Sequence, residues 1–196
     1  EVKLVSVYRD TLLNTEDDTY DKANSAYAVG GAEAAVNMLN RNLDLNIQDY
    51  VSVNFLAVAD VVDLLGGIDL DLTDEEVVHM NNYCVETSEI TGKKYKKIEP
   101  EVAGTYHLNG VQAVSYSRIR YTEGGDFQRT SRQRLVIEKI AEEAKKADLS
   151  TINKIIDAVF PEITTSFTSG EIVKMSAGLL QYSIGEIGRA SCRERV

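Results

Sequence analysis

Hydrophobic positions along the 196-residue chain switch repeatedly between the spacing of strands and the spacing of helices. Alternation over residues 2–8 and 68–72, and a shorter apolar run over 50–56, predict three strands. Apolar residues three and four positions apart predict helices over 32–43, 58–65, 73–85, 111–117, 127–146, 150–159 and 169–183. Strands interleaved with helices indicate an α/β or α+β domain.

Local signals predict where several of these elements begin and end. Thr73, followed by Glu76, is a capping signature for the start of a helix. Gly30 and Gly31 are expected to break the chain ahead of the helix over 32–43. The acidic, polar residues 15–21 predict an exposed loop, and the lysine-rich residues 88–98 predict a loop or a hairpin.

The charge balance argues against one broad class of function. The chain holds 21 Lys and Arg against 31 Asp and Glu, a formal net charge of −10 at pH 7. A nucleic-acid binder needs a broad basic surface, so no nucleic-acid partner is expected. A small, locally basic site for one anionic group remains compatible with this balance.

Arginines are concentrated in one short window. Ahead of residue 188 the chain has seven arginines, and five of them lie within 17 residues that contain no lysine: Arg118, Arg120, Arg129, Arg132 and Arg134. The planar guanidinium group donates paired hydrogen bonds to phosphate oxygens, which the point charge of lysine does not match. The window therefore predicts a phosphate-binding site.

Spacing supports this prediction. Arg129, Arg132 and Gln133 lie at i, i+3 and i+4, so a helix places them on one face. Arg118 and Arg120 share a face if their segment is extended. Asp126 is placed to cap the long helix, whose N-terminal N–H groups favour an anion. Together these residues predict a diphosphate pocket. The alternative is that the arginines pair with acidic residues on a solvated face and that Asp126 is only a cap.

Other catalytic patterns are weak. His79 and His107 lack a partner motif and are expected to be structural, and no nucleophile elbow, phosphate-binding loop or zinc spacing occurs. Asp10 follows Arg9 at a predicted strand end, which is where α/β sites form. Cys84 is expected to be free, because Cys192 lies in a segment of foreign composition.

Several ordered motifs resemble the LytR–CpsA–Psr family. Residues 6–11 read Ser-Val-Tyr-Arg-Asp-Thr and look like the family's Ser-x-x-Arg-Asp-Thr element. The further matching segments are 22–27 with the following glycine pair, 50–68, 107–113 leading into 117–120, and 125–133. The last two are the most specific, and the resemblance covers roughly residues 1–185.

This resemblance implies a fold and an activity. The expected fold is a three-layer α/β/α sandwich with a central mixed sheet over residues 1–187, with the first strand or strands missing. The expected activity is that of a phosphotransferase, which moves a glycopolymer such as wall teichoic acid or capsule from an undecaprenyl-pyrophosphate carrier to peptidoglycan. The implied location is the extracytoplasmic face of the bacterial membrane, with a single N-terminal membrane anchor that this fragment lacks. Residues 188–196 are expected to be a non-native tail.

The resemblance also assigns roles to individual residues. It implies that Arg9, Arg118, Arg120 and Asp126 serve catalysis. The pyrophosphate would be contacted by Arg9, Arg118, Arg120, Arg129 and Gln133.

A metal is expected in the intact parent only. The family's magnesium-binding aspartates precede the Ser-x-x-Arg-Asp-Thr element, and this chain begins after them. Asp10 does not match one of those ligands. The prediction is therefore Mg²⁺ in the parent and no metal site in this fragment.

Two further hypotheses remain open. The chain could be a non-catalytic module that binds a polyprenyl pyrophosphate or regulates the cell envelope. It could also be a surface interaction domain whose arginines only pair with acids.

Overall fold

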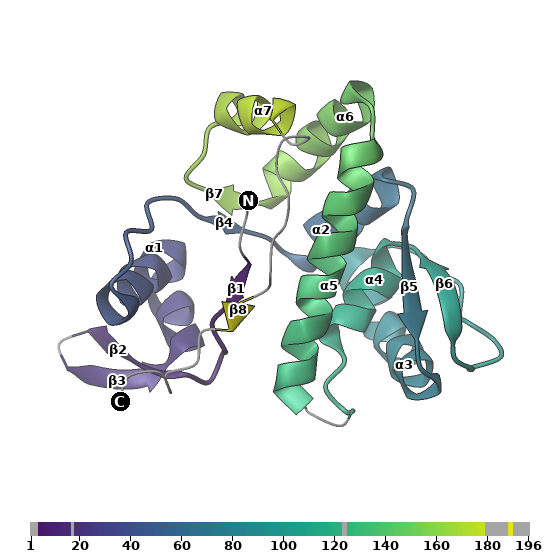
Figure 1. Cartoon of the computed structure of the whole chain (residues 1–196), viewed down its shortest axis with the longest axis horizontal. Coiled ribbons are helices and arrows are strands. Elements are labelled where there is room, and N and C mark those ends of the chain that lie inside the picture. Colours follow the sequence, from purple (N-terminus) through teal and green to yellow (C-terminus); the bar gives the residue numbers. More distant parts are fainter. Residues whose placement is uncertain (1–3, 17, 123–124, 179–187, 190–196) are drawn as a thin grey trace. The chain divides into compact units, whose positions relative to one another are not determined.

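The computed structural model describes residues 4–16, 18–122, 125–178 and 188–189. These residues form two compact units (Figure 1). The N-terminal unit contains the described residues up to 52 together with 164–168 and 188–189. The central unit contains residues 53–163, without the gap at 123–124, and 169–178.

The strands of the N-terminal unit pair two by two. The pairs are β1 (Val5–Ser6) with β8 (Gly188–Arg189) in parallel, β2 (Leu12–Glu16) with β3 (Thr19–Lys22) antiparallel, and β4 (Val51–Ser52) with β7 (Thr164–Thr165) antiparallel. The β2–β3 hairpin corrects the prediction of a loop over 15–21. The polar composition of this segment did not prevent strand pairing, because the hydrogen bonds between strands are made by the backbone and need no apolar side chains. Only Leu13 of β2 is buried.

Helix α1 (Ala23–Leu43) begins well before the predicted residue 32. The chain kinks rather than breaks at the glycine pair. Gly31 has φ 66° and ψ −156°, a backbone conformation that is essentially restricted to glycine. Ala26 and Met38, on either side of the kink, pack with Leu13 in the small core of this unit. The kink therefore brings both halves of α1 against one strand.

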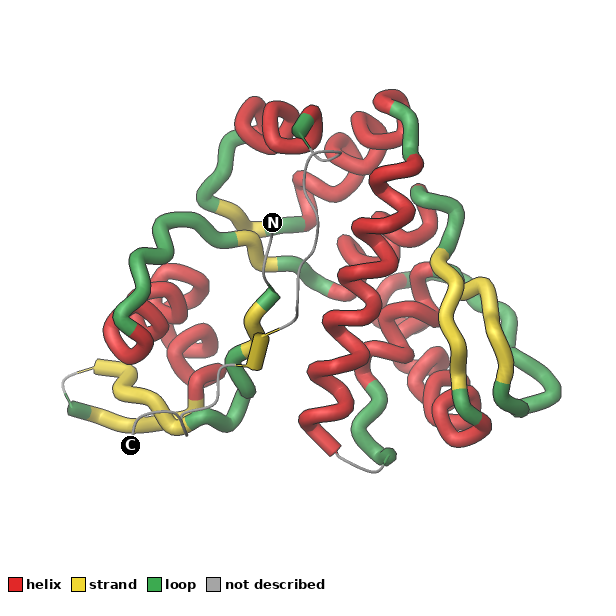
Figure 2. Tube along the Cα trace, in the orientation of Figure 1, coloured by secondary structure: helices red, strands yellow, loops and turns green. Residues whose placement is uncertain are grey.

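The central unit is mostly helical (Figure 2). Its elements are α2 (Phe55–Leu64), β5 (Ile68–Leu72), α3 (Asp74–Thr91), β6 (Gly104–Leu108), α4 (Gly110–Arg118), α5 (Gly125–Lys146), α6 (Leu149–Val159), the 3₁₀ turn η1 (Phe160–Glu162) and α7 (Ser169–Ala177). The predicted strand over 50–56 is wrong beyond β4, because the Asn54 side chain accepts a hydrogen bond from the Ala57 N–H and starts a helix at Phe55. Strand β6 was not predicted.

The main core lies in the central unit. Strand β5 alternates as predicted, with Ile68, Leu70 and Leu72 buried and its two aspartates exposed. These side chains pack with apolar residues of α2, α3 and α4 and with Val136 of α5. The core therefore holds together the helices that carry the arginine window.

Helix α3 starts where the sequence predicts. Thr73 Oγ1 accepts from the Glu76 N–H, and the Glu76 carboxylate accepts from the Thr73 N–H, which completes a capping box. The helix ends at Thr91, not near residue 85, with Gly92 as a left-handed cap. The prediction stopped early because the next buried positions are Thr87 and Thr91, whose side chains interrupt the apolar pattern.

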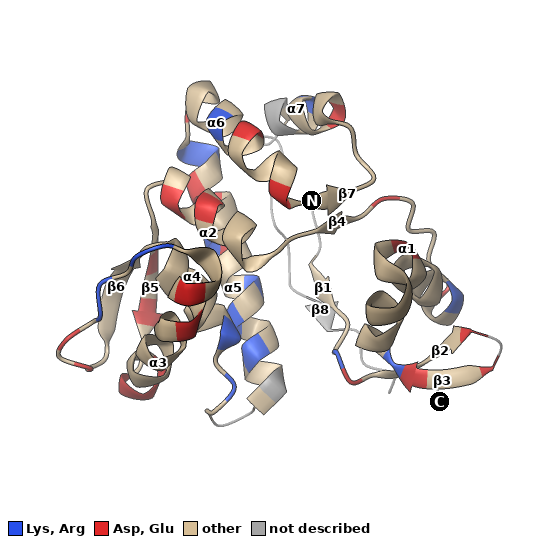
Figure 3. Ribbon diagram, turned by 180° about the vertical axis from the view of Figure 1, so that it is seen from behind, with Lys and Arg blue, Asp and Glu red and all other residues tan. Residues whose placement is uncertain are grey.

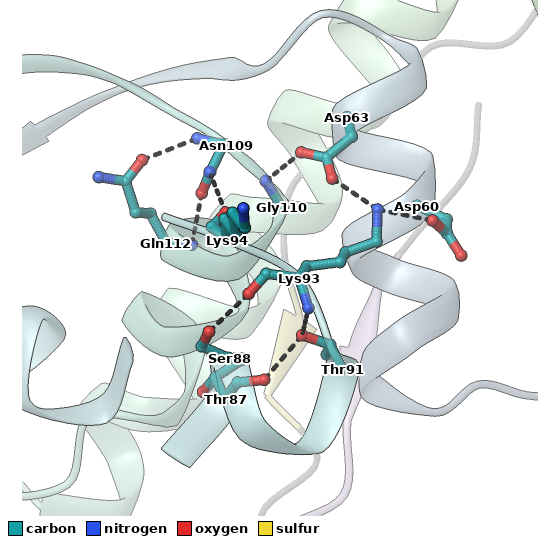
Figure 4. A network of polar contacts seen from close by, with 10 residues as sticks. All are labelled: Asp60, Asp63, Thr87, Ser88, Thr91, Lys93, Lys94, Asn109, Gly110 and Gln112. Carbon is teal, nitrogen blue, oxygen red and sulfur yellow. Dashed lines mark hydrogen bonds and ion pairs between the residues drawn. The ribbon is translucent and has the colours of Figure 1, made fainter. Parts of the chain in front are cut away.

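A polar network attaches the segment after α3 to helices α2 and α4 (Figure 4). Lys93 Nζ lies 2.7 Å from both Asp60 and Asp63 of α2. The other carboxylate oxygen of Asp63 accepts from the Gly110 N–H at the start of α4. Burial lowers the pKa of Lys93, but the hydrogen bonds to Asp60 and Asp63 outweigh burial and raise it overall. The lysine therefore stays charged and fixes α4 beside α2.

The α/β class is confirmed. Among the described strands, β1 and β8 form a parallel pair and the other three pairs are antiparallel, and each pair is a separate two-stranded sheet rather than part of one central mixed sheet. Within the residues described, no helix combines the length and the apolar character needed to cross a membrane. Cys84 is free and buried, and burial raises the pKa of its thiol to about 11. Cys192 and most of the predicted tail lie outside the described residues, so the tail stays a prediction.

A pH-dependent contribution to stability is expected from His107. It faces Asp69 across β5 and β6, with Nδ1 2.6 Å from the carboxylate and Nε2 2.7 Å from the Gly66 carbonyl oxygen. The Asp69 hydrogen bond, followed by the Gly66 contact, raises the pKa of His107 above its ordinary 6.5. The stabilisation is complete below that ordinary value and is lost as pH rises through the raised pKa.

Replacement His107→Gln should therefore lower the melting temperature more at about pH 5.5 than at about pH 8.5. The pair is exposed, so the difference should be on the order of 1 °C. Melting curves of both proteins across this range measure it. A difference that is independent of pH would contradict the assignment.

Candidate functional site

A cavity of about 340 Å³ opens in the central unit among helices α2 to α5. Its lining residues are Phe55, Tyr83, Ser117, Arg118, Arg120, Tyr121, Arg129 and Gln133. The volume lies at the lower end of the range of about 300 to 1,000 Å³ that is typical of small-molecule pockets. Four of these residues, the three arginines and the glutamine, are predicted site residues. The structure thus brings together side chains from both parts of the arginine window.

The exit from α4 directs two arginines to the cavity. Ile119 ends the helix with an extended backbone (φ −56°, ψ 126°), and its side chain is fully buried. Side chains alternate along an extended segment, so the residues on either side of Ile119 point the opposite way. Arg118 and Arg120 both line the cavity, and their catalytic and binding roles stay predictions.

Arg118 is held by four neighbouring side chains. Its Nη1 donates to Thr87 Oγ1 at 2.9 Å, and its Nη2 donates to Glu86 Oε2 at 2.7 Å. The guanidinium carbon lies 4.7 Å from the centre of the Phe55 ring and 5.3 Å from that of Tyr83, both within cation–π range. The side chain is 16% exposed. Arg118 is therefore a partly desolvated charge with a fixed orientation.

Helix α5 supplies the other wall. Basic residues follow one another along its first half (Figure 3). Arg129 is buried and Gln133 is exposed one turn later, and both line the cavity. Their i, i+4 spacing accounts for the shared face.

Arg132 does not join them, which corrects the prediction of a three-residue face. Its Nε donates to Glu76 at 2.8 Å, Nη1 donates to the Ile119 carbonyl at 3.3 Å, and Nη2 donates to Thr122 at 2.8 Å. The guanidinium also lies 5.8 Å from the Tyr116 ring. Burial, with the charge of Glu76 acting the same way, raises the pKa of Tyr116 to about 12. Arg132 is thus a structural ion-pair partner, as the alternative hypothesis proposed for the whole window.

The remaining predicted residues are not among the described residues that line the cavity. Asp126 occupies the first turn of α5, which begins at Gly125, so it is not the residue that precedes the helix. Its side chain lies outside the described part. Arg9 and Asp10 belong to the N-terminal unit, where the Arg9 carbonyl accepts from the Asn24 N–H at 3.3 Å and Asp10 pairs with Lys22 at 3.0 Å. The roles of Arg9 and Asp126 stay predictions.

The site chemistry favours an anion. Three guanidinium groups reach one small cavity in a chain of net charge −10, so positive potential is concentrated locally. The aromatic rings of Phe55 and Tyr83 exclude water from one side of Arg118, which strengthens its electrostatic interactions. Among the described residues, no group of three or more His, Cys, Asp or Glu is placed to hold a metal ion. No chemical step is assigned to a metal ion here.

Comparison with known proteins decides the family. The LytR_cpsA_psr family model matches residues 1–193. The chain belongs to the LytR_cpsA_psr family. The motifs that carried the resemblance include the segments on which the cavity arginines lie.

Two named relatives are similar in sequence to this chain. Biofilm regulatory protein A of Streptococcus mutans is 35% identical in an alignment of 172 positions that covers 83% of this chain and 40% of that protein. A protein named polyisoprenyl-teichoic acid–peptidoglycan teichoic acid transferase TagU, from Enterococcus faecalis, is 32% identical over 179 residues, which are 90% of this chain and 53% of that protein. The chain thus spans about half the length of the curated relatives it matches.

A solved structure supports the fold. The crystal structure of Bacillus subtilis TagV matches with a TM-score of 0.69 and 25% identity, covering 94% of this chain and 68% of that one. The predicted α/β fold of the LytR_cpsA_psr family is thereby confirmed.

Sequence reasoning missed the residues that surround Arg118. Tyr83, Glu86 and Thr87 lie at i, i+3 and i+4 of α3, which is the spacing of one helix face. The helix was predicted to end near residue 85, so Tyr83 was placed inside it and Glu86 and Thr87 were placed outside it. Extending the helix to Gly92 on its C-cap signal would have revealed it.

The Glu76–Arg132 pair should dominate the local stability of this family member. The side chain of Arg132 is 7% exposed and that of Glu76 is 14% exposed. The change Arg132→Met would leave a buried carboxylate without its partner, at a cost of about 3 to 5 kcal/mol in the free energy of unfolding. Urea denaturation measures this loss.

The matched control is Lys139→Met on the same helix. Lys139 pairs with Glu142 at 2.9 Å, with side chains 33% and 47% exposed. Removal of such a surface pair should cost less than about 1 kcal/mol. Equal losses in the two variants would show that Arg132 has no special structural role.

Proposed function

We propose that this chain is the pyrophosphate-binding part of a phosphotransferase that moves a glycopolymer from a polyprenyl-pyrophosphate carrier to peptidoglycan. The observation that carries the proposal is the cavity in which Arg118, Arg120, Arg129 and Gln133 meet. The name of the TagU relative, a teichoic acid transferase, supports teichoic acid as the class of polymer. Capsule-type polymers remain within the proposal.

The proposed chemistry needs positioning and charge stabilisation from the protein. In phosphoryl transfer, negative charge spreads over the equatorial oxygens of the transferred group and over the leaving group. Arginine N–H groups that are already oriented toward those oxygens stabilise this charge without reorganising during the reaction. Arg118, Arg120 and Arg129 have that role in the proposal, and Gln133 contributes its amide. The acceptor is a hydroxyl group of peptidoglycan.

Three further features are proposed for the whole protein on the basis of the family resemblance. They are magnesium as a Lewis acid, a single N-terminal membrane anchor and a location on the extracytoplasmic face of the membrane. Each follows from the family resemblance and remains a prediction. Arg9 and Asp126 are retained as proposed participants on the same basis.

Binding of a short polyprenyl pyrophosphate tests the site. In calorimetric titrations with geranylgeranyl pyrophosphate, the double variant Arg118→Ala/Arg120→Ala should bind at least about 100-fold more weakly than the unmodified chain, because two charge-assisted contacts are lost. Binding should also weaken as salt is raised.

The control is Lys139→Ala/Lys145→Ala, which removes the same charge from the far part of α5. Lys139 and Lys145 do not line the cavity. If both double variants lose affinity equally, general charge and not the cavity is responsible, and the proposed site is wrong.

A second candidate is a binding module without turnover. The name of the S. mutans relative, Biofilm regulatory protein A, supports this candidate. The transfer rate of the longer protein separates the two functions. If the chain belongs to an enzyme, Arg118→Ala should reduce that rate by on the order of 10² to 10³. Retained binding with no measurable transfer by the unmodified longer protein would favour the module.

A further inference from the structure

Four side chains enclose the Arg118 guanidinium, and we call them the Arg118 cradle: Phe55, Tyr83, Glu86 and Thr87. Three come from one face of α3, and Phe55 is the first residue of α2. Two members hold the edge of the guanidinium by hydrogen bonds, and two are aromatic rings that lie against it within cation–π distance. Both the rotation and the tilt of the group are thereby restricted.

Thr87 is the member whose chemistry is most specific. Its side chain is fully buried, and Oγ1 accepts from Arg118 Nη1 at 2.9 Å. Water does not reach a fully buried hydroxyl, so nothing replaces this acceptor if it is removed. A valine would fill the same space without accepting the hydrogen bond.

Arg120 shows the contrast within the same cavity. It is exposed, and in the part of the chain that the structure describes its guanidinium makes no hydrogen bond or ion pair. Two arginines from one short segment thus meet the cavity differently. Arg118 is fixed by the protein, whereas Arg120 is left to be oriented by a ligand.

The hydrogen-bond count leaves Arg118 able to bind an anion. A guanidinium has five N–H donors, and Thr87 and Glu86 each take one. The three remaining donors have no partner among the described residues, and Arg118 lines the cavity. Fixing the group in advance reduces the conformational entropy that binding would otherwise cost.

We propose that Thr87 is a positioning residue that, together with the rest of the Arg118 cradle, orients Arg118 toward a diphosphate in the cavity. This inference rests on the proposed function, because the diphosphate is its ligand. Thr87 acts only through Arg118 and does not line the cavity itself.

The decisive variants are Thr87→Val, which keeps shape and removes the acceptor, and Thr87→Ser, which keeps the acceptor. Calorimetry with geranylgeranyl pyrophosphate should show about 10-fold weaker binding for Thr87→Val, as expected for loss of a hydrogen bond to a charged group. Thr87→Ser should bind within about threefold of the unmodified chain. Melting temperatures establish that both variants are folded.

A ligand-free readout examines Arg118 directly. In ¹⁵N NMR spectra, a guanidinium with hindered rotation gives separate Nη signals, and a freely rotating one gives an averaged signal. The unmodified chain and Thr87→Ser should give separate signals for Arg118, and Thr87→Val an averaged one. Phe55→Leu, at a position that is 39% exposed, provides a second variant with little risk to folding and should also average the signals.

The outcomes separate the two claims. Unchanged affinity and unchanged Arg118 signals in Thr87→Val would overturn the inference alone. Equal losses of affinity in Thr87→Ser and Thr87→Val would indicate a packing effect and also overturn it. Absence of binding by the unmodified, folded chain would overturn the proposed function and with it the ligand that the cradle is proposed to serve.

Discussion

The buried pair between Glu76 and Arg132 is the interaction on which the arrangement of the site depends. Glu76 closes the capping box at the start of α3 with one carboxylate oxygen and accepts from Arg132 of α5 with the other. Arg132 also donates to the Ile119 carbonyl at the end of α4 and to Thr122 beyond it. One guanidinium thus ties three helices and the segment between α4 and α5. A buried ion pair with this many hydrogen bonds satisfies most of its own polar groups, which limits its desolvation cost.

The cavity follows from that junction. Fixing α5 against α3 and α4 sets Arg129 and Gln133 opposite the exit of α4, where Arg118 and Arg120 emerge. The same packing brings the continuous face of α3 under Arg118. Arg118 and Arg132, from the same arginine window, therefore have different roles. The guanidinium of Arg132 is engaged in hydrogen bonds to other parts of the protein. The guanidinium of Arg118 is held by two hydrogen bonds, and its other N–H groups are proposed to bind a ligand.

The sequence predicted the parts of the site that depend on spacing along one element. Arg129 and Gln133 share a helix face, and Arg118 and Arg120 share a side of an extended exit, because those relations are set by backbone geometry. The sequence could not predict that Arg132 pairs with Glu76 instead of lining the cavity, because the two residues lie 56 positions apart in the chain. The α3 face around Arg118 was missed because two buried threonines hid the last turns of that helix. The hairpin over residues 12–22 was missed because its strands carry few apolar residues.

A crystal structure of the chain with geranylgeranyl pyrophosphate tests the central claim most directly. The account predicts that the diphosphate lies in the cavity lined by Arg118, Arg120 and Arg129, with at least one oxygen within hydrogen-bond distance of Arg118. A second cavity of the central unit, of about 310 Å³ and lined in part by Asp63, Lys96 and His107, offers an alternative site. A diphosphate bound there, with the arginine cavity empty, would contradict the account.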